Sequence, residues 1–510
     1  MSENNALKKI AKGGIIYTAG RFGATFLQFI SGLIVIHAIE KSEYGLLSLG
    51  QVWLGIAVSF SSLGLGSGLP RIIAKYTTKG GKEDIDAVIS SSLHITLIVS
   101  ALISLIFFCV TIWFIEAKGN HQFAYVLYFF SFMIVPTVMI NTLSTIFRGF
   151  EKIEPEAVFN NIIPNTLRIL LLILIVFMGM RIKGVLIANV ATIWMTLCLF
   201  ILYSSKHLIK NLSFLNLRSF SKEIFLFSLP LMGVQLMGQL MNWVPMLMIG
   251  HYHLADEVGL FNAPSRLAVL FPIPLLAIAT LYLPIATKHY EEQNILKIKE
   301  LYASTTKWSF LLTLPICLYA TLDSQFIVTT LFGTEYLNSA PVLIALSIGS
   351  SIHSLLGPNG ITLLSCGNRK IVFWSTVLST ILVVVASLIL IPHYGAIGAA
   401  IAFTSAISVS NICISLLLNR YYHIHPFSRN YIKPVLFTIA IAIGCYFLMD
   451  LLNIKAWYIH ILFLFVLISI SLLSPVLTRS LSQDDLDMLK MIEFRIHRKT
   501  TVAEKLKGVI

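Results

Sequence analysis

Long apolar runs separated by short polar segments dominate the chain from about residue 13 to residue 475. A helix needs about 20 mostly apolar residues to cross ~30 Å of hydrocarbon. Because backbone groups inside a bilayer must be satisfied within the segment, such runs are predicted to be helices. The pattern predicts an all-α polytopic membrane protein with about 14 transmembrane helices. The predicted spans cover residues 13–38, 45–69, 87–115, 122–147, 156–180, 184–204, 223–249, 258–286, 309–332, 338–364, 371–392, 395–419, 432–450 and 455–475.

The chain also repeats its own pattern at an offset of 214 residues, drifting once to 218. The recurring positions are Glu43, Gly45 and Leu46 with Glu257, Gly259 and Leu260; Leu69, Pro70 and Tyr76 with Leu283, Pro284 and Tyr290; Gly149 and Lys152 with Gly367 and Lys370; and Gly184, Ile187 and Ala188 with Gly398, Ile401 and Ala402. Ordered matches of this kind predict an internal duplication. We expect an N-lobe of spans 1–6 (residues 1–222), a C-lobe of spans 7–12 (223–430), and spans 13–14 with a cytoplasmic tail (431–510). Chains built from two fused halves commonly hold substrate between them, which predicts transport through a central cavity.

The composition agrees with a membrane protein, because 56% of the residues are hydrophobic and 12% are charged, against roughly 25% charged in soluble domains. The net charge of +13 is distributed by side rather than gathered in a nucleic-acid patch. Most Lys and Arg fall at the N-terminus, in loops after even-numbered spans and in the tail. Loops after odd-numbered spans hold only Lys41, Lys118, Arg181, Lys183 and Lys455. By the positive-inside rule, both termini are predicted to lie on the cytoplasmic side. The protein is predicted to reside in the cytoplasmic (inner) membrane.

Catalytic chemistry is not expected. The chain has no Walker A pattern, no Gly-rich dinucleotide turn and no HExxH motif. Its six cysteines form no metal-spaced pair. We therefore predict no enzyme activity, no cofactor, no bound metal and no nucleic-acid partner.

Polar residues inside the predicted spans form stripes at helical spacing, which mark candidate cavity positions. Such residues are costly in lipid and face a cavity or a partner helix. The stripe of the first span recurs, at an offset of 214, in the seventh. The candidates are Arg21, Thr25 and Gln28 in the first span; Gln235, Gln239 and Asn242 in the seventh; Asn161, Asn165 and Arg168 in the fifth; and Asn262 and Arg266 in the eighth.

Two other roles remain open for these residues: amides and hydroxyls also join helices, and Arg21 and Arg266 lie within snorkelling reach of a span end. In a cavity, guanidinium groups suit phosphate and amides suit sugars. This chemistry predicts an anionic, polyhydroxylated substrate. Asp323, a carboxylate inside the ninth span, is predicted either to pair with an arginine or to mark an earlier helix end.

From about residue 10 to 475 the chain resembles the polysaccharide and O-antigen flippases of the multidrug/oligosaccharidyl-lipid/polysaccharide exporter superfamily. The resemblance is carried by AKGGIIYTAGRFGATFLQF (11–29), EYGLLSLGQ (43–51), LPRIIAKY (69–76), FRGFEKIEPEA (147–157), DEVGLFNAPSRL (256–267) and LPIATKHY (283–290). These motifs specify the superfamily better than the substrate.

The resemblance implies two bundles that translocate polyprenyl (undecaprenyl) diphosphate-linked oligosaccharide repeat units by alternating access. It implies that Arg21 and Arg266 bind the diphosphate; a role for Arg168 is inferred from the sequence alone. It also implies a lipid-tail groove at spans 13–14, contact with membrane lipids, and partnership with a polysaccharide polymerase and a chain-length regulator.

Two alternatives compete with the flippase hypothesis. A cation-coupled multidrug exporter of the same superfamily typically carries an acidic residue inside its first or seventh helix, where this chain has Arg21 and Gln235. A membrane polymerase or ligase needs a sizeable outer loop for acceptor sugars, and every predicted outer loop is short.

Overall fold

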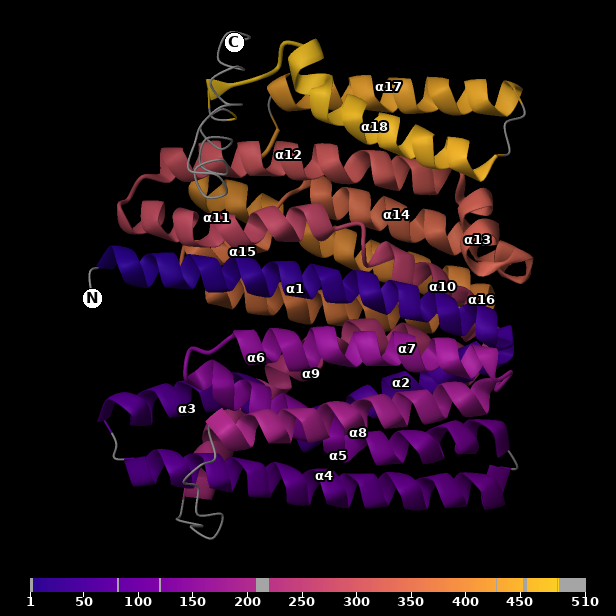
Figure 1. Ribbon diagram of the computed structural model, residues 1–510. Helices are drawn as coiled ribbons and strands as arrows, with labels where there is room; N and C mark the ends of the chain where they lie inside the picture. Colours follow the sequence, from indigo (N-terminus) through magenta and orange to yellow (C-terminus); the bar gives the residue numbers. More distant parts are fainter. Residues whose placement is uncertain are drawn as a thin grey trace. The chain divides into compact units, whose positions relative to one another are not determined.

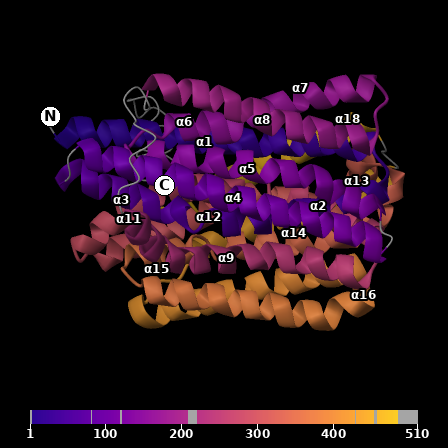
Figure 2. The same ribbon diagram turned by 90° about the horizontal axis from the view of Figure 1, so that it is seen from below.

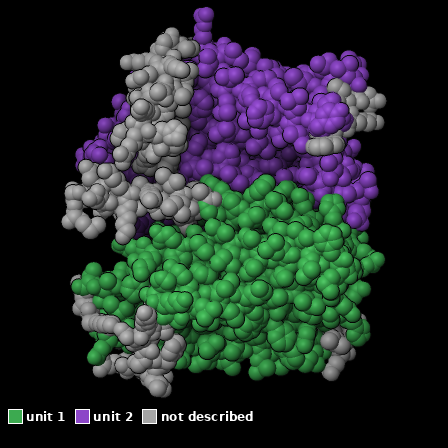
Figure 3. Space-filling model, in the orientation of Figure 1, with its two compact units in different colours: residues 1–263 green, residues 264–510 purple. Residues whose placement is uncertain are grey.

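The computed structural model describes residues 3–79, 82–118, 121–207, 220–427, 429–452, 456–483 and 485. All regular secondary structure in these residues is helical, as the sequence predicts (Figure 1). The chain forms two compact units, residues 1–263 and 264–510 (Figure 3). In each unit, taken by itself, long helices run side by side as a bundle (Figures 1 and 2).

The first unit contains the helices that begin with the predicted first span. They are α1 (Glu3–Ala38), α2 (Lys41–Ser61), α3 (Leu65–Lys79), α4 (Lys82–Lys118), α5 (His121–Gly149), α6 (Glu154–Glu156), the π-helix η1 (Ala157–Ile162), α7 (Ile163–Phe177), α8 (Ile182–His207), α9 (Phe220–Tyr252) and α10 (Ala255–Ala268), of which α10 ends beyond the unit boundary. The unit thus includes α9, which corresponds to the predicted seventh span. The three-part division at residues 222 and 430 stays a prediction.

The second unit contains the remaining helices. They are α11 (Ile273–Glu291), α12 (Ile295–Leu322), α13 (Ser324–Phe332), the 3-10 helix η2 (Thr334–Ser339), α14 (Ala340–Leu355), α15 (Asn359–Ser365), α16 (Arg369–Tyr422), α17 (Arg429–Leu451) and α18 (Trp457–Leu477). The segment α16 consists of two helices that meet at a kink, and they correspond to the predicted spans 371–392 and 395–419. Its backbone departs from helical geometry at Gly395, which has φ 52° and ψ −127°.

Every predicted span falls on one helix or on two or three consecutive helices. Among the described residues, ten helices are long and apolar enough to cross a membrane, or up to twelve if each bent pair counts as one span. The chain is therefore a multi-pass membrane protein, and the count of fourteen stays a prediction.

The helix breaks follow the glycines and prolines of the sequence. α2 ends at Ser61 and α3 begins at Leu65, with Gly64 between them at φ +74°. The turn before Pro272 separates α10 from α11, and the two helices meet at a bend of 44°. Such breaks are tolerated at membrane depth where neighbouring protein satisfies the freed backbone.

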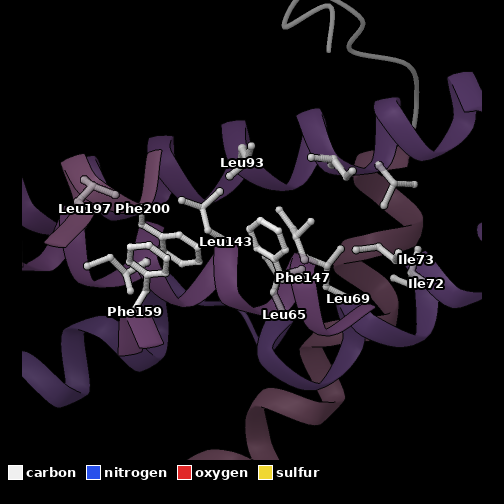
Figure 4. Packing of buried hydrophobic residues seen from close by; sticks show 14 residues of the cluster. Leu65, Leu69, Ile72, Ile73, Leu93, Leu143, Phe147, Phe159, Leu197 and Phe200 are labelled. Carbon is white, nitrogen blue, oxygen red and sulfur yellow. The ribbon is translucent and has the colours of Figure 1, made fainter. Parts of the chain in front are cut away.

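A buried hydrophobic cluster fixes the position of α3 and η1 in the first unit (Figure 4). Leu69 and Ile73 of α3 are fully buried, and Phe147 of α5 stacks on Phe200 of α8. Phe159 of η1 also stacks on Phe200, with ring centroids 4.3 Å apart and planes 4° from parallel. The cluster therefore anchors the segment that begins the fifth predicted span.

Candidate functional site

The predicted stripe of the seventh span lies on α9, where two of its glutamines bind the helices of the second span. Gln235 donates from Nε2 to Ser67 Oγ at the start of α3, at 2.8 Å. Gln239 donates to Ser59 Oγ of α2, at 3.2 Å. Gln235 is half-buried, whereas Gln239 and Asn242 are exposed. The stripe thus joins helices through hydroxyl partners and still presents amide groups.

α9 lies very close to the break between α2 and α3. A Cβ atom placed on Gly64 would lie 2.2 Å from the carbonyl oxygen of Ser228. Together with its positive φ, this approach restricts the position to glycine. The glycine-rich end of the second span therefore serves both as a turn and as a packing surface for α9.

Residues related by the sequence repeat touch one another where α2 crosses α10. A Cβ on Gly45 would lie 1.8 Å from the carbonyl oxygen of Ala255. A Cβ on Gly259, the repeat counterpart of Gly45, would lie 2.9 Å from the carbonyl oxygen of Lys41. Lys41 and Ala255 are themselves 214 residues apart. The contact is therefore reciprocal, as expected about a local pseudo-twofold axis.

Polar contacts extend this repeat crossing, defined here as Lys41–Ser48 of α2 against Ala255–Asn262 of α10. Asn262 donates from Nδ2 to Ser48 Oγ at 2.5 Å, and these two residues are again 214 apart. The same amide lies 3.2 Å from the Tyr44 hydroxyl. At the start of both helices, Lys41 Nζ pairs with Asp256 Oδ2 at 3.3 Å. Asn262, predicted as a cavity residue, thus holds two helices together.

The stripe of the first span lies on α1, which packs beside η1 and α7. The two segments run in the same direction (Figures 1 and 2), and Gly20 faces Ala157. Arg21 and Gln28 are exposed, and Thr25 is half-buried with its hydroxyl donating to the carbonyl oxygen of Arg21 at 2.9 Å.

The fifth span begins in the π-helix η1 and continues as α7, so its stripe lies along the helix pair that neighbours α1. Asn165 is buried, and its Nδ2 donates to the carbonyl oxygen of Asn161 at 2.6 Å. Arg168 is half-buried one turn further on. π-helical turns often occur at functional sites, since they rotate side chains relative to an α-helix. The structure therefore brings the helices of the first and fifth spans together within one unit.

Two further predicted positions lie elsewhere. Arg266 is half-buried in the last turn of α10. Asp323 follows α12 at a break where α12 and α13 bend by 86°, so its prediction as a helix end is correct. His460 of α18 lies 2.7 Å from its carboxylate.

An ion pair between an exposed arginine and a buried carboxylate in the FRGFEKIEPEA motif was not predicted. Arg148, in the last turn of α5, donates from Nε to Glu156 Oε2 at 2.7 Å and from Nη2 to the other carboxylate oxygen. Its Nη1 lies 3.5 Å from the carbonyl oxygen of Gly66 in α3. The Glu156 side chain is 7% exposed. The pair joins the ends of three helices next to η1.

The chemistry available at these positions is hydrogen bonding and positive charge. Within the described residues, no group of three or more His, Cys, Asp or Glu is placed to hold a metal ion. The exposed members of the stripes are a guanidinium, on Arg21, and amides, on Gln28, Gln239 and Asn242. Such groups bind phosphate oxygens and sugar hydroxyls.

Comparison with known proteins identifies the family. The family described as "Polysaccharide biosynthesis protein" matches residues 10–290. The teichuronic acid biosynthesis protein TuaB of Bacillus subtilis (strain 168) is 26% identical over 44% of this chain and 46% of its own length. A probable low-salt glycan biosynthesis flippase, Agl15 of Haloferax volcanii, is 23% identical over 78% of this chain and 80% of its own. Against TuaB, and likewise CapF of Staphylococcus aureus, the chain spans about half the relative's length.

Solved structures show the fold. The lipid II flippase MurJ in an inward closed conformation matches with a TM-score of 0.70 and 15% identity, covering 91% of this chain and 98% of its own. An inward-facing multidrug resistance transporter of the MATE family matches with a TM-score of 0.66 and 19% identity, over 80% of this chain and 98% of its own. At these identities the likeness concerns the fold alone.

Because the family match covers more than half of the chain, the protein belongs to the polysaccharide biosynthesis protein family, and the family predicted from the sequence is confirmed. The membrane location, the all-helical class and the transporter fold agree with this membership.

Proposed function

We propose that this protein is a flippase that translocates polyprenyl diphosphate-linked oligosaccharide repeat units across the cytoplasmic membrane for surface polysaccharide assembly. Family membership over residues 10–290 is the observation that carries the proposal. A relative similar over most of its length is described as a probable glycan biosynthesis flippase, which agrees with it. The transporter fold and the family give no support to an enzymatic role.

The substrate chemistry proposed here follows from the exposed stripe. Arg21 binds the diphosphate, and Arg266 takes the same role further along the path. Gln28, Gln239 and Asn242 bind sugar hydroxyls through their amides. Bidentate guanidinium binding suits a diphosphate better than the point charge of a lysine. The lipid tail stays in the bilayer along α17 and α18.

Alternating access requires a contact that closes one side of the path and opens in the other state. We propose the repeat crossing for this role. By the predicted topology, with cytoplasmic termini, the crossing lies at the outer end of α2 and α10. Its reciprocal glycines permit backbone contact without interlocked side chains, and the Asn262 amide, bonded to Ser48 and Tyr44, closes it together with the Lys41–Asp256 ion pair. Such a contact opens at small energetic cost.

The exporter alternative of the same superfamily has a related fold, which does not separate the two functions. Neither predicted span 13–38 nor predicted span 223–249 has a carboxylate away from its ends. Cation-coupled exchange at those helices therefore lacks a proton or sodium acceptor. A polysaccharide polymerase and a chain-length regulator are proposed as partners because the exported repeat unit must be polymerised.

The deciding experiment quantifies polyprenyl-diphosphate-linked oligosaccharide and surface polysaccharide in a deletion strain. We expect the complete lipid-linked repeat unit to accumulate while surface polysaccharide is lost. Wild-type protein should restore export, and Arg21→Ala, present in the membrane at equal amount, should not. Unchanged lipid intermediates and unchanged surface glycan would refute the proposal. Energy-dependent efflux of cationic dyes in the same strains would favour the exporter.

A further inference from the structure

The last helix of the second unit, α18, packs along α12 and against α17. We call the α12–α18 interface the tail seam. The proposed function places the lipid tail along α17 and α18. The tail could pass between α12 and α18 only if the tail seam opened during transport, and the contacts at the two ends of the seam bear on this.

At one end, a buried ion pair ties α12 to the segment that follows α18. Lys307 of α12 is 3% exposed and Asp485 is 1% exposed. Lys307 Nζ donates to the Asp485 carboxylate and to the carbonyl oxygen of Ser480, the latter at 2.8 Å. A buried charge whose partner leaves is strongly destabilising, so this contact resists separation.

Other donors complete the hydrogen bonding of the Asp485 carboxylate. Ser304 Oγ and Trp308 Nε1, both on α12, lie 2.9 and 3.0 Å from Oδ1. The backbone nitrogen and hydroxyl of Ser482 lie 2.9 and 3.0 Å from Oδ2. Both carboxylate oxygens are hydrogen-bonded, so the Asp485 side chain holds α12 and the chain after α18 in one fixed arrangement.

At the other end, His460 of α18 reaches the break after α12. Its Nδ1 lies 2.7 Å from Asp323 Oδ2, and its ring stacks on Phe326 with centroids 3.7 Å apart. Between the two ends, Ser471 Oγ donates to the carbonyl oxygen of Leu311 at 2.5 Å. From residue 307 to residue 323, α12 rises about 24 Å at ~1.5 Å per residue. The seam is therefore fastened across most of a hydrocarbon layer of ~30 Å.

We propose that the tail seam stays closed throughout the transport cycle, with Lys307 and Asp485 as the positioning residues that hold it. α17 and α18 then move with α12 as one body. A lipid tail cannot pass between α12 and α18 and instead follows the outer surface of the last two helices. Large apolar side chains such as Phe447 and Phe465 are exposed there. The path of the lipid tail rests on the proposed function, whereas the closed tail seam does not.

The test compares two cross-links in a variant whose six native cysteines are replaced by alanine or serine. Leu311→Cys with Ser471→Cys bridges the tail seam, and Ser48→Cys with Asn262→Cys bridges the repeat crossing. After treatment with a short bis-methanethiosulfonate, which forms a disulfide with each cysteine and releases sulfinate, movement of lipid-linked oligosaccharide in proteoliposomes is measured before and after reductive cleavage of the bridge. We expect a change of less than twofold for the seam bridge and at least a tenfold loss for the crossing bridge. Arrest by the seam bridge that is reversed on cleavage would overturn the proposal.

A second measurement is independent of transport. The rate of bridging at positions 311 and 471 should be the same whether the repeat crossing is bridged or free; a rate that changes more than threefold would contradict a closed seam. Asp485→Asn should slow this bridging at least threefold, and the matched apolar pair Lys307→Met with Asp485→Leu should restore it. If the seam behaves as expected while the unbridged parent moves no lipid-linked oligosaccharide, the proposed function fails and the closed seam stands.

Discussion

The substitution Gly45→Ala tests the role of the repeat crossing most directly. The added Cβ would lie 1.8 Å from the carbonyl oxygen of Ala255, whereas real Cβ atoms essentially never approach another heavy atom within 3.0 Å. The obstacle is backbone, so no side-chain rotation relieves it, and the two helices must separate. Overpacking of this kind costs about 1–3 kcal/mol. A cost of about 2 kcal/mol shifts an equilibrium roughly 30-fold away from the closed crossing.

Two other glycines provide graded controls. Gly259→Ala places its Cβ 2.9 Å from the carbonyl oxygen of Lys41 and should have a smaller effect in the same direction. Gly238→Ala, on α9, meets no heavy atom within 4 Å and should leave the crossing unchanged. As a helix-interior glycine, it should even gain up to ~1 kcal/mol of helix propensity.

The assay is the rate of cross-linking between cysteines introduced by Ser48→Cys and Asn262→Cys, in membranes without added substrate. We expect the rate to fall with Gly45→Ala in proportion to the population of the closed crossing, by up to about 30-fold, less with Gly259→Ala, and not at all with Gly238→Ala. Equal cross-linking rates in the Gly45→Ala and Gly238→Ala proteins, both present at wild-type amounts, would show that the helices accommodate the methyl group and that the argument from backbone contact is wrong.

Three further predictions concern charges and amides. Arg21→Ala and Arg266→Ala should each reduce export at least tenfold without loss of folded protein, and lysine at either position should restore only part of it; full activity of both alanine variants would refute their role in diphosphate binding. Arg148→Ala leaves the buried carboxylate of Glu156 without its guanidinium. Because the Arg148 side chain is 42% exposed, the unfolding free energy should fall by about 1–2 kcal/mol, between the values for exposed and buried pairs, measured as a lower midpoint of thermal unfolding in detergent; an unchanged midpoint would show that the carboxylate finds another donor. Gln235→Leu should lower the unfolding free energy by about 1 kcal/mol and reduce export less than Arg21→Ala does. An equal loss of export in the two variants would show that the Gln235 amide binds substrate.

The helical fold follows from the apolar runs, and the breaks follow from local chemistry. Gly64 cannot continue α2 into α3 because it takes a positive φ, and Asp323 marks the end of α12. The number of spans depends on how the kinked segment α16 is divided. Its two helices meet at the kink at Gly395 and correspond to the separate predicted spans 371–392 and 395–419.

The sequence predicted which helix face carries each polar residue of the candidate site, but it did not predict which residues they contact. Spacing places Gln235 and Gln239 on one side of a helix, yet it does not say that Ser67 and Ser59 would meet them. Helical periodicity reports which way a residue points, and contacts between helices depend on packing angle and register.

The missed ion pairs have the same cause. Arg148 and Glu156 are eight residues apart across a turn, a spacing that no helix face explains. Lys307 and Asp485 are separated by 178 residues. In both cases a buried charge was visible in the sequence only as an ordinary polar residue at the end of a span.

The reciprocal contact at the repeat crossing has an ancestral consequence. In a symmetric homodimer of a single half, each residue near the axis would face its own copy, as in any isologous interface. One substitution there would change both subunits. A side chain facing its own copy would therefore have to act as hydrogen-bond donor and acceptor at once. Gene fusion removes this constraint, because each copy then mutates alone. The hydrogen bond from Asn262 to Ser48 fits such a division of labour, because two unlike residues occupy positions that the predicted duplication relates.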